Sequence, residues 1–418
     1  MKTAISLFSC AGIGDLAFRR SGINVVLASE LLKDRCDIFK LNYPQTKMIE
    51  GSIWDKEKEI VKSTKVLLKN KSLDFALVTP PCQGMSKNGK GKLLSEIRAG
   101  RRPEVDERNL LIIPALNILK EVSPEVIIFE NVSEMLNTII PYENQPIGII
   151  ELIKKKLKGY SVEEKVINFA DYGIPQNRKR LITLATKKKS HKIHLKKMKT
   201  LFPEQTHFSE SDLLSKRWRT LRDAIGLEEE LDGSTKLRSD ENPLHFVSKL
   251  DERKYHWISL TPEGRSAFDN QCIECNFSNN QKHSSKKNIQ GINKASEETP
   301  IYCIECGSVL PRPHVEEGSK KRIMKGFTSA YKRMSWDEPA SAITTNFPYV
   351  SSDNKVHPSQ NRTLSVYEAM IIQTIQPDEF KFWSKSPKDI KFTTIRESIG
   401  ESVPPKMIEL ILKKLSSI

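Results

Sequence analysis

Residues 74–86, DFALVTPPCQGMS, join an apolar run to a stiff turn that carries a cysteine. A short, nearly continuous apolar run is typical of a buried parallel strand, and ligands of open α/β sheets bind beyond the carboxyl ends of such strands. Pro80 and Pro81 each fix φ and lack an amide donor, so the strand must end there and Cys82 follows on a rigid loop. Such a cysteine is either a small buried hydrophobe or a nucleophile.

A second apolar run, EVIIF at residues 125–129, leads to Glu130 and Asn131. If the two runs form adjacent strands, a thiol and a carboxylate face one substrate from neighbouring strand ends. This pairing favours the catalytic interpretation of Cys82.

Composition indicates a soluble globular protein with ample chain for a core. The 418 residues predict two or three domains, and no run is long enough to span a bilayer. We interpret the apolar amino terminus as a first strand, not a signal peptide, and expect a cytoplasmic protein, associated with the nucleoid if bacterial. The net charge of +15 suggests a polyanionic partner, with a generally basic, solvated surface as the alternative.

The first 30 residues follow the pattern of a nucleotide-cofactor site. We expect a strand at 3–8, a loop SCAGIG at 9–14, a helix at 15–20 and a strand from 24 that ends at Glu30. Gly12 and Gly14 permit a tight turn beside a ligand, and an acidic residue at the end of a second strand suits ribose hydroxyls. Further helices are expected at 34–42, 108–122, 149–157 and 406–415, and a strand at 181–186.

The motifs PPCQ (80–83), ENV (130–132) and PQNRKR (175–180), in this order, resemble those of the DNA (cytosine-5) methyltransferase family. The resemblance covers nearly the whole chain except a block at about 187–335. It implies an α/β fold: a Rossmann-like class I methyltransferase domain at 1–186, a smaller target-recognition domain at 187–350, and a return segment at 351–418. We expect the recognition domain to carry a zinc-binding insertion at about 272–306.

The resemblance also implies S-adenosylmethionine as cofactor and carries site residues over by position. Catalytic positions are Cys82, Glu130, Asn131, Gln176, Arg178 and Arg180. Cofactor positions are Phe8, Ser9, Gly12, Gly14, Glu30, Leu31, Ser52, Ile53, Pro80, Ser402 and Val403. The chain departs from the family at Cys10 and Ile13, where Gly is usual, at Ser52 in place of Asp, and at Glu401 in place of Asn.

Cytosine carbon 5 is a poor nucleophile, which explains the need for a thiol. Addition of the Cys82 thiolate to carbon 6 would make an enamine that attacks the sulfonium methyl, and loss of the carbon 5 proton would then expel the thiol. Glu130 would bond ring nitrogen 3 and the exocyclic amine, for which it must carry or share a proton. The base must be flipped out of the duplex.

Four of the seven cysteines form two C-x-x-C pairs, Cys272 with Cys275 and Cys303 with Cys306. This arrangement is typical of a closed, tetrahedral zinc site with a structural role, and reduced, unliganded thiols are the alternative. We expect His283 and His314 nearby to be ordinary surface histidines. The polar, Lys-rich chain between the pairs has too few apolar residues to form a core, so the metal would supply folding energy.

The leading hypothesis is a sequence-specific DNA methyltransferase that acts on double-stranded DNA as a monomer, with a cognate restriction endonuclease as a further candidate partner. A transfer-RNA cytosine methyltransferase and a catalytically inactive DNA-binding regulator are the alternatives. The large middle block argues against the first alternative, and the intact PPCQ and ENV argue against the second. The basic stretch 87–102 suggests a lid over the phosphate backbone. Candidate base-reading residues are Arg312, Lys320, Lys321, Arg322 and Lys325.

Overall fold

The computed structural model describes residues 1–81, 85, 106–197, 199–210, 215–287, 293–295, 298–318, 320–324 and 328–418. Its centre is a seven-stranded sheet in the order β3-β2-β1-β4-β5-β10-β8. The strands are β1 (Thr3–Leu7), β2 (Asn24–Glu30), β3 (Lys47–Glu50), β4 (Phe75–Val78), β5 (Val126–Asn131), β8 (Ser161–Asn168) and β10 (Lys179–Thr186). The first five are parallel to one another, and β10 runs antiparallel to both β5 and β8.

Helices cover both faces of the sheet. On one face lie α3 (Ile53–Leu68), α5 (Ile112–Val122) and α6 (Ile149–Lys156), and on the other lie α1 (Leu16–Arg20) and α12 (Pro405–Ser416). Ile127 and Ile128 of β5 point to opposite faces and enter these two cores, as the two-residue period of a strand requires. A strand buried on both faces explains why 125–129 reads as a continuous apolar run.

The order of the strands reverses between β1 and β4, because the chain moves outward from β1 to β3 and then returns to β4. Such a switch point leaves a crevice at the carboxyl ends of the strands. The cofactor loop after β1 and the proline turn after β4 both start at this point.

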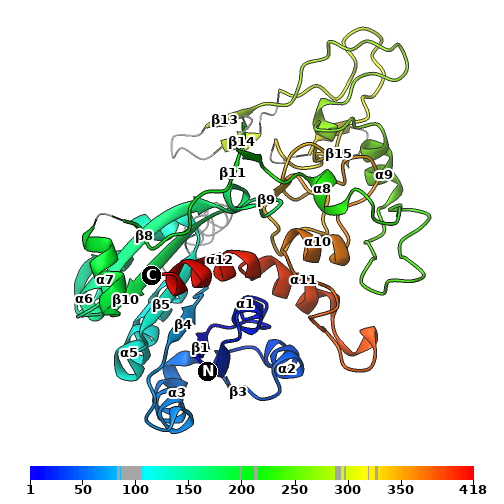
Figure 1. Ribbon diagram of the computed structural model, residues 1–418. Coiled ribbons are helices and arrows are strands. Elements are labelled where there is room, and N and C mark those ends of the chain that lie inside the picture. The colour runs from blue at the N-terminus through cyan, green and yellow to red at the C-terminus, as the bar shows by residue number, and fades with distance from the viewer. Residues whose placement is uncertain are drawn as a thin grey trace.

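A second group of elements extends away from the sheet and contains α8 (Leu221–Ile225), α9 (Glu252–Ser259), β11 (His207–Phe208), β12 (Lys216–Arg217), and the hairpins β13 (Ser285–Lys287) with β14 (Asn293–Ala295) and β15 (His314–Glu317) with β16 (Lys320–Ile323). We call residues 200–333 the recognition segment, after the role that the sequence predicts for this part of the chain. Figure 1 shows most of it above the sheet, in green to yellow. Much of an apolar cluster lies within it, including Trp257, Phe268 and Tyr331, and Val350 and Val356 of the returning chain complete this cluster.

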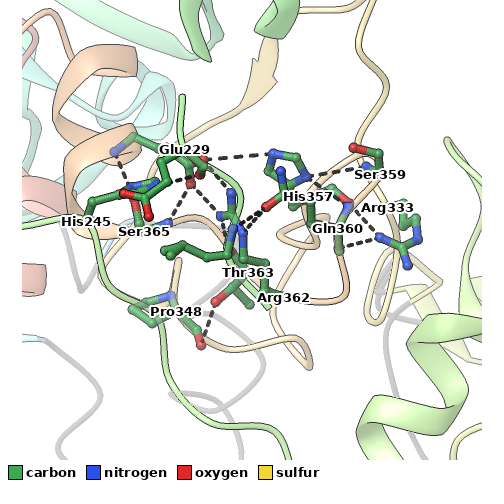
Figure 2. A network of polar contacts seen from close by, with 12 residues as sticks. Glu229, His245, Arg333, Pro348, His357, Ser359, Gln360, Arg362, Thr363 and Ser365 are labelled. Atoms are coloured by element: carbon green, nitrogen blue, oxygen red, sulfur yellow. Dashed lines mark hydrogen bonds and ion pairs between the residues drawn. The ribbon is translucent and has the colours of Figure 1, made fainter. Parts of the chain in front are cut away.

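The chain then returns to the sheet through β17 (Ala340–Ser341), α10 (Val366–Ile372), α11 (Phe392–Glu401) and α12. β17 pairs with β9 (Gln176–Asn177), so the returning chain adds a short strand to the PQNRKR stretch. The red α12 in Figure 1 lies beside the blue α1, which brings the two ends of the chain onto one face of the sheet. Near α10, Figure 2 shows a network of polar contacts that joins this helix to the recognition segment.

The expected α/β class is confirmed, as are the strands at 3–8, 24–30, 125–129 and 181–186 and the helices at 15–20, 34–42, 149–157 and 406–415, within one or two residues. The expected helix 108–122 begins as a 3₁₀ turn, η1 (Glu107–Leu111), and becomes α-helical only at Ile112. The proposed domain limits remain predictions. Within the described ranges, no helix has the length and apolar character needed to cross a membrane.

Candidate active site

The loop after β4 is held by the end of β5. Asn131 is buried, and its Nδ2 donates a hydrogen bond to the Pro80 carbonyl oxygen at 2.9 Å. β4 and β5 are adjacent and parallel, with Val78 opposite Phe129, so the expected pairing of the two apolar runs is confirmed. Cys82 itself lies outside the described residues, as does the basic stretch 87–102. Asn131 therefore fixes the backbone two residues before the predicted nucleophile.

Glu130 lies at the same edge of the sheet and is buried. The Arg180 Nε on β10 approaches Glu130 Oε1 at 3.2 Å, and this ion pair is largely withdrawn from solvent. Burial raises the pKa of the Glu130 carboxyl, while Arg180 and Arg178 oppose the rise. A carboxyl with a raised pKa retains its proton up to pH values closer to neutral. In that form it can donate a hydrogen bond to an unprotonated ring nitrogen.

Arg178 is buried and donates to main-chain oxygens of two other segments. Its Nη1 donates to Ile343 O at 2.5 Å, and its Nη2 donates to Gly400 O at 3.3 Å and Ser402 O at 3.2 Å. These contacts join the PQNRKR stretch to the chain after β17 and to the end of α11.

Gln176, which is fully buried, makes equivalent connections. Its Oε1 accepts from Ile343 N at 2.9 Å, and its Nε2 donates to Gln373 Oε1 at 2.8 Å. Gln373 Nε2 in turn donates to Ile399 O at 2.7 Å and contacts Ser402 O at 3.3 Å. The structure thus brings Glu130, Asn131 and Arg180 together, whereas Gln176 and Arg178 bind main-chain and amide groups of residues 343, 373, 400 and 402.

On the cofactor side, the Glu30 carboxylate accepts hydrogen bonds from two backbone amides. Cys10 N donates to Oε2 at 2.9 Å and Leu32 N donates to Oε1 at 3.0 Å. These bonds fix the carboxylate between the loop after β1 and the start of α2 (Lys33–Asn42). Leu31, next to it, is largely exposed.

The loop after β1 has an unusual backbone in which Phe8, Cys10 and Gly12 all have positive φ, of 60°, 50° and 86°. A Cβ at Gly12 would lie 2.6 Å from the Tyr43 ring and 2.7 Å from the Phe39 ring, so only glycine fits. Tyr43 Oη also donates to Gly12 O at 2.7 Å. Aromatic packing from α2 therefore sets the loop geometry in spite of the missing glycine at position 10.

The remaining cofactor positions surround the same switch point. A Cβ on Gly14 would be 3.0 Å from Val403 Cγ1, so the return segment packs on the loop after β1. Ser9 and Ser402 are buried, and Ser402 Oγ donates to Ile399 O at 2.8 Å. Ser52 precedes Ile53 at the start of α3, and its side chain makes no capping hydrogen bond.

The four cysteines of the two C-x-x-C pairs converge in the recognition segment, with all four Sγ atoms within 4.8 Å of one another. The Cys272–Cys306 and Cys275–Cys303 sulfur distances are 3.6 and 3.7 Å. A tetrahedron of thiolates with Zn–S bonds of about 2.3 Å has sulfur–sulfur edges of about 3.8 Å. The arrangement fits a zinc ion.

The two pairs also have matching backbones. In each, the first cysteine donates its N–H to the carbonyl five residues later, Phe277 or Ser308, at 3.3 and 2.8 Å. The residue after each second cysteine, Asn276 or Gly307, is left-handed, with φ of 59° and 74°. Two equivalent knuckles therefore face each other.

Two expectations for the recognition segment are wrong. Arg312 cannot read bases, because it is fully buried and donates to the carbonyl oxygens of Asn270, Gln281 and Pro300. His314 is buried, not on the surface; its ring packs near Trp257. Among the other candidates, Lys320 is exposed, Lys321 and Arg322 lie on the same strand paired with glutamates, and Lys325 lies outside the described residues.

Sequence reasoning missed Gln373 and Arg35. Gln373 gives no local signal, because it follows an apolar helix and meets Gln176 only in the folded chain. Arg35 also looked like an ordinary surface residue of a helix, yet it forms ion pairs with Glu401 and Glu397. The departure from the family at Glu401 could have pointed to a compensating cation.

Comparisons with known proteins agree with this geometry. A sequence model described as C-5 cytosine-specific DNA methylase matches residues 2–417. The type II methyltransferase M1.HgaI of Avibacterium volantium is 29% identical, and the alignment covers 98% of this chain and 97% of that protein. The type II methyltransferase M.AquIA of a Picosynechococcus strain is 31% identical over 54% of this chain and 88% of its own length.

Solved structures share the fold. A prophage-encoded E. coli protein assigned as a DNA modification methyltransferase superposes with a TM-score of 0.55 at 20% identity, covering 100% of this chain and 99% of the other. The S. pombe Dnmt2 methyltransferase superposes with a TM-score of 0.54 at 13% identity, covering 100% of this chain and 98% of the other.

Proposed function

Because the chain belongs to the C-5 cytosine-specific DNA methylase family, we propose that it transfers a methyl group from S-adenosylmethionine to carbon 5 of a flipped-out cytosine in duplex DNA. The chain is thus an enzyme, a DNA (cytosine-5) methyltransferase. The names of its type II relatives support a role in restriction-modification, with a cognate restriction endonuclease as a partner. The observation that carries the proposal is the buried Glu130–Arg180 pair beside the loop that leads to Cys82.

In this proposal Cys82 is the nucleophile that adds to carbon 6. The hydrogen bond from Asn131 to Pro80 O holds the backbone two residues before Cys82 at the end of β4. S-adenosylmethionine, when bound, supplies an electrophilic methyl group. As carbon 5 takes the methyl group, the methyl–sulfur bond breaks and the sulfonium leaves as a neutral thioether. Proton loss from carbon 5 and departure of the thiolate from carbon 6 then restore the aromatic ring and the enzyme.

Glu130 would hold the base by its nitrogen 3 edge. The raised pKa of its carboxyl supports a protonated form that donates to ring nitrogen 3 and offers its other oxygen to the exocyclic amine. Arg180, paired with Glu130 Oε1, would orient the carboxyl and reach the base carbonyl with its planar fork. Gln176 and Arg178 would act as positioning residues, because their hydrogen bonds to Ile343 hold the PQNRKR stretch in place.

The residues around the switch point fit the cofactor. Hydrogen bonds from two backbone amides orient the Glu30 carboxylate, which is suited to binding ribose hydroxyls. The turn at residues 8–14 would bring its backbone close to the cofactor. We expect Glu30→Ala to weaken S-adenosylmethionine binding by about 1 to 3 kcal/mol, the cost of hydrogen bonds to a charged group. Unchanged affinity in calorimetry would place the ribose elsewhere.

The central test is covalent trapping. Wild-type protein with S-adenosylmethionine and duplex DNA containing 5-fluorocytosine should form a denaturant-resistant adduct, because fluorine cannot leave as a proton does. Cys82→Ala should form none while it still binds cofactor and DNA. Tritium transfer to duplex DNA but not to transfer RNA would separate this function from a transfer-RNA methyltransferase, and an inactive regulator would label neither.

The four cysteines support a structural zinc ion, which Cys272, Cys275, Cys303 and Cys306 would hold with no open position for water. The site is in the recognition segment and Cys82 is not, so the metal would have no part in methyl transfer. We further propose that the enzyme acts as a monomer on double-stranded DNA, with residues 187–350 as the recognition domain and 351–418 completing the catalytic domain.

A further inference from the structure

Arg35 of α2 and two glutamates of α11 form an ion-pair cluster at the cofactor end of the sheet. Arg35 Nη1 lies 2.6 Å from Glu401 Oε2, and Arg35 Nη2 lies 3.5 Å from Glu397 Oε2. The Arg35 side chain is only 11% exposed, while the side chains of Glu397 and Glu401 are 32% and 29% exposed. The pairing joins two helices from opposite ends of the chain.

Local geometry explains how one guanidinium serves two carboxylates. Glu397 and Glu401 are four residues apart, so they lie one above the other on one face of α11. The planar fork of arginine presents two N–H groups in parallel, which a lysine cannot do. The pair therefore fixes both the position and the rotation of α11 relative to α2.

A neighbouring face of α11 is held by the chain that comes after β17. Arg396 Nη1 donates to Thr345 O, and a Cβ on Gly400 would lie 2.2 Å from Thr345 N. Arg396 also forms an ion pair with Glu397 at 3.4 Å, so Glu401 is the carboxylate that depends more on Arg35. Arg35 and residues 344–345 thus hold two adjacent faces of the helix. Ser402 and Val403 come directly after α11, and Val403 packs on Gly14 of the cofactor loop.

Arg35 also balances the negative charge of nearby carboxylates at the cofactor end of the sheet. Two carboxylates are close enough to act on Arg35, that of Glu401 and that of Glu30, which would bind the ribose. Burial alone would lower the pKa of Arg35, but these neighbours raise it overall. Burial also raises the pKa of Cys10 to about 12, so this thiol stays neutral and the negative charges near Arg35 come from carboxylates.

We propose that Arg35 is a positioning residue for the cofactor site. Its ion pair with Glu401, which we call the latch, holds α11 against α2 and neutralises the Glu401 carboxylate near Glu30. This inference rests on the proposed S-adenosylmethionine site. It explains how an acidic residue can stand at position 401, where the family usually has asparagine. Glu401 is turned toward Arg35, and the latch sets the place of Ser402 and Val403.

A double-mutant cycle tests the latch. Calorimetry would measure S-adenosylmethionine affinity for wild type, Arg35→Met, Glu401→Gln and the double variant. We expect Arg35→Met to weaken binding about 10-fold or more, Glu401→Gln to weaken it less than about 3-fold, and the double variant to recover most of the loss. Recovery is expected because Arg35→Met removes the arginine from the ion pair with Glu401, and Glu401→Gln then removes the other charge of the same pair.

Lys33→Met is the matched control, because Lys33 is on the same helix and pairs with Asp37 in solvent. Arg35→Lys is a second variant that keeps the charge but loses the fork, and it should bind with intermediate affinity. Additive effects in the cycle, or unchanged affinity in both Arg35 variants, would overturn the latch. Wild-type protein that binds no S-adenosylmethionine would instead refute the proposed function.

Discussion

At the scale of single residues, burial and charged neighbours together set the protonation of Glu130, and its protonation decides its proposed role. Its pKa is raised because the cost of burying a charge exceeds the stabilisation from Arg180 and Arg178. If the protonated form holds the base, activity should decline as the pH rises through this pKa, because the deprotonated carboxylate cannot donate to nitrogen 3. The direction is opposite to that of a carboxylate acting as a base.

We therefore predict that Glu130→Ala lowers single-turnover methyl transfer about 10²- to 10⁴-fold, the usual contribution of a positioned acid. Glu130→Gln, a permanent neutral donor, should lose less and should lack the decline at high pH that Glu130 causes. Rates measured across the pH range would check both. If the methyl-transfer rate of Glu130→Gln still declined at high pH as in wild type, the decline would have to be assigned to another group.

Gly400 gives a second prediction, this one about packing. An added Cβ would lie 2.2 to 2.7 Å from backbone atoms of Thr344 and Thr345, which cannot move as a flexible side chain could. Gly400→Ala should lower the free energy of unfolding by about 1 to 3 kcal/mol, as overpacking does. Denaturant unfolding would measure it, with Gly148→Ala as control because its nearest neighbour would be 3.9 Å away. Equal losses in both variants would argue against the clash.

The sequence predicts some of these residues well and others poorly. Cys82 and Glu130 follow apolar strands, so their place at a sheet edge can be inferred from local pattern alone. Arg312 cannot be distinguished locally from a DNA-binding arginine, because its three carbonyl partners come from other segments. Burial of a charged side chain depends on contacts that a linear pattern does not contain.

At the scale of elements, the buried parallel strands were predictable because both faces are apolar. β8 was not, because it lies at the edge of the seven-stranded sheet and carries Glu163, Glu164 and Lys165. α3 was also missed: its start at Ser52 was identified as a cofactor segment, and the helix that begins there is rich in lysine and glutamate. An edge strand and a half-exposed helix have weak patterns, whereas central strands have strong ones.

The network in Figure 2 fastens α10 to the recognition segment. Arg362 and Glu368 form a fully buried, two-pronged ion pair at 2.7 Å. His357 accepts backbone N–H bonds at Nδ1, 3.0 Å from Gln360 N. Burial and the charge of Arg362 lower the pKa of His357 to about 3. This histidine is therefore neutral in the folded protein.

The network predicts acid sensitivity with a definite sign. In the unfolded chain His357 takes up a proton near pH 6.5, but in the folded protein only near pH 3, so its stabilisation is present above pH 6.5 and is lost as the pH falls. The His357→Gln variant carries a side chain that is neutral at every pH. Between pH 6.5 and pH 3 its free energy of unfolding should therefore fall by about 3 to 5 kcal/mol less than that of wild type. Denaturant unfolding at a series of pH values would test it, and parallel pH curves for the two proteins would contradict it.

At the scale of the whole molecule, the order of segments was predictable but their connections were not. β9 pairs with β17. Gln176 meets Gln373, which is 197 positions later in the chain. These contacts bring the base-side stretch, the exit from the recognition segment and the cofactor-side end of α11 into one buried cluster. Motif order indicates that such segments belong to one site, but only the folded chain specifies which atoms connect them.

The last prediction separates the recognition segment from the catalytic core. Cys303→Ser with Cys306→Ser removes two of the four sulfurs that lie within 4.8 Å of one another, so zinc should be lost. Among the described residues, the knuckle cluster consists of Cys272, Cys303 and Leu310 with Phe277 packed against it, which is too small to stay folded without metal. The double variant should lose specific DNA binding while S-adenosylmethionine affinity stays near that of wild type.

Metal analysis, fluorescence anisotropy with duplex DNA and calorimetry with the cofactor would measure these three effects on the same preparations. Cys36→Ser is a suitable control, because this buried thiol is near the cofactor end and far in sequence from the knuckles. Less than about half an equivalent of zinc in wild-type protein would count against the site. Full DNA binding by a zinc-free double variant would remove its role in recognition, because the duplex would then be held without the knuckles.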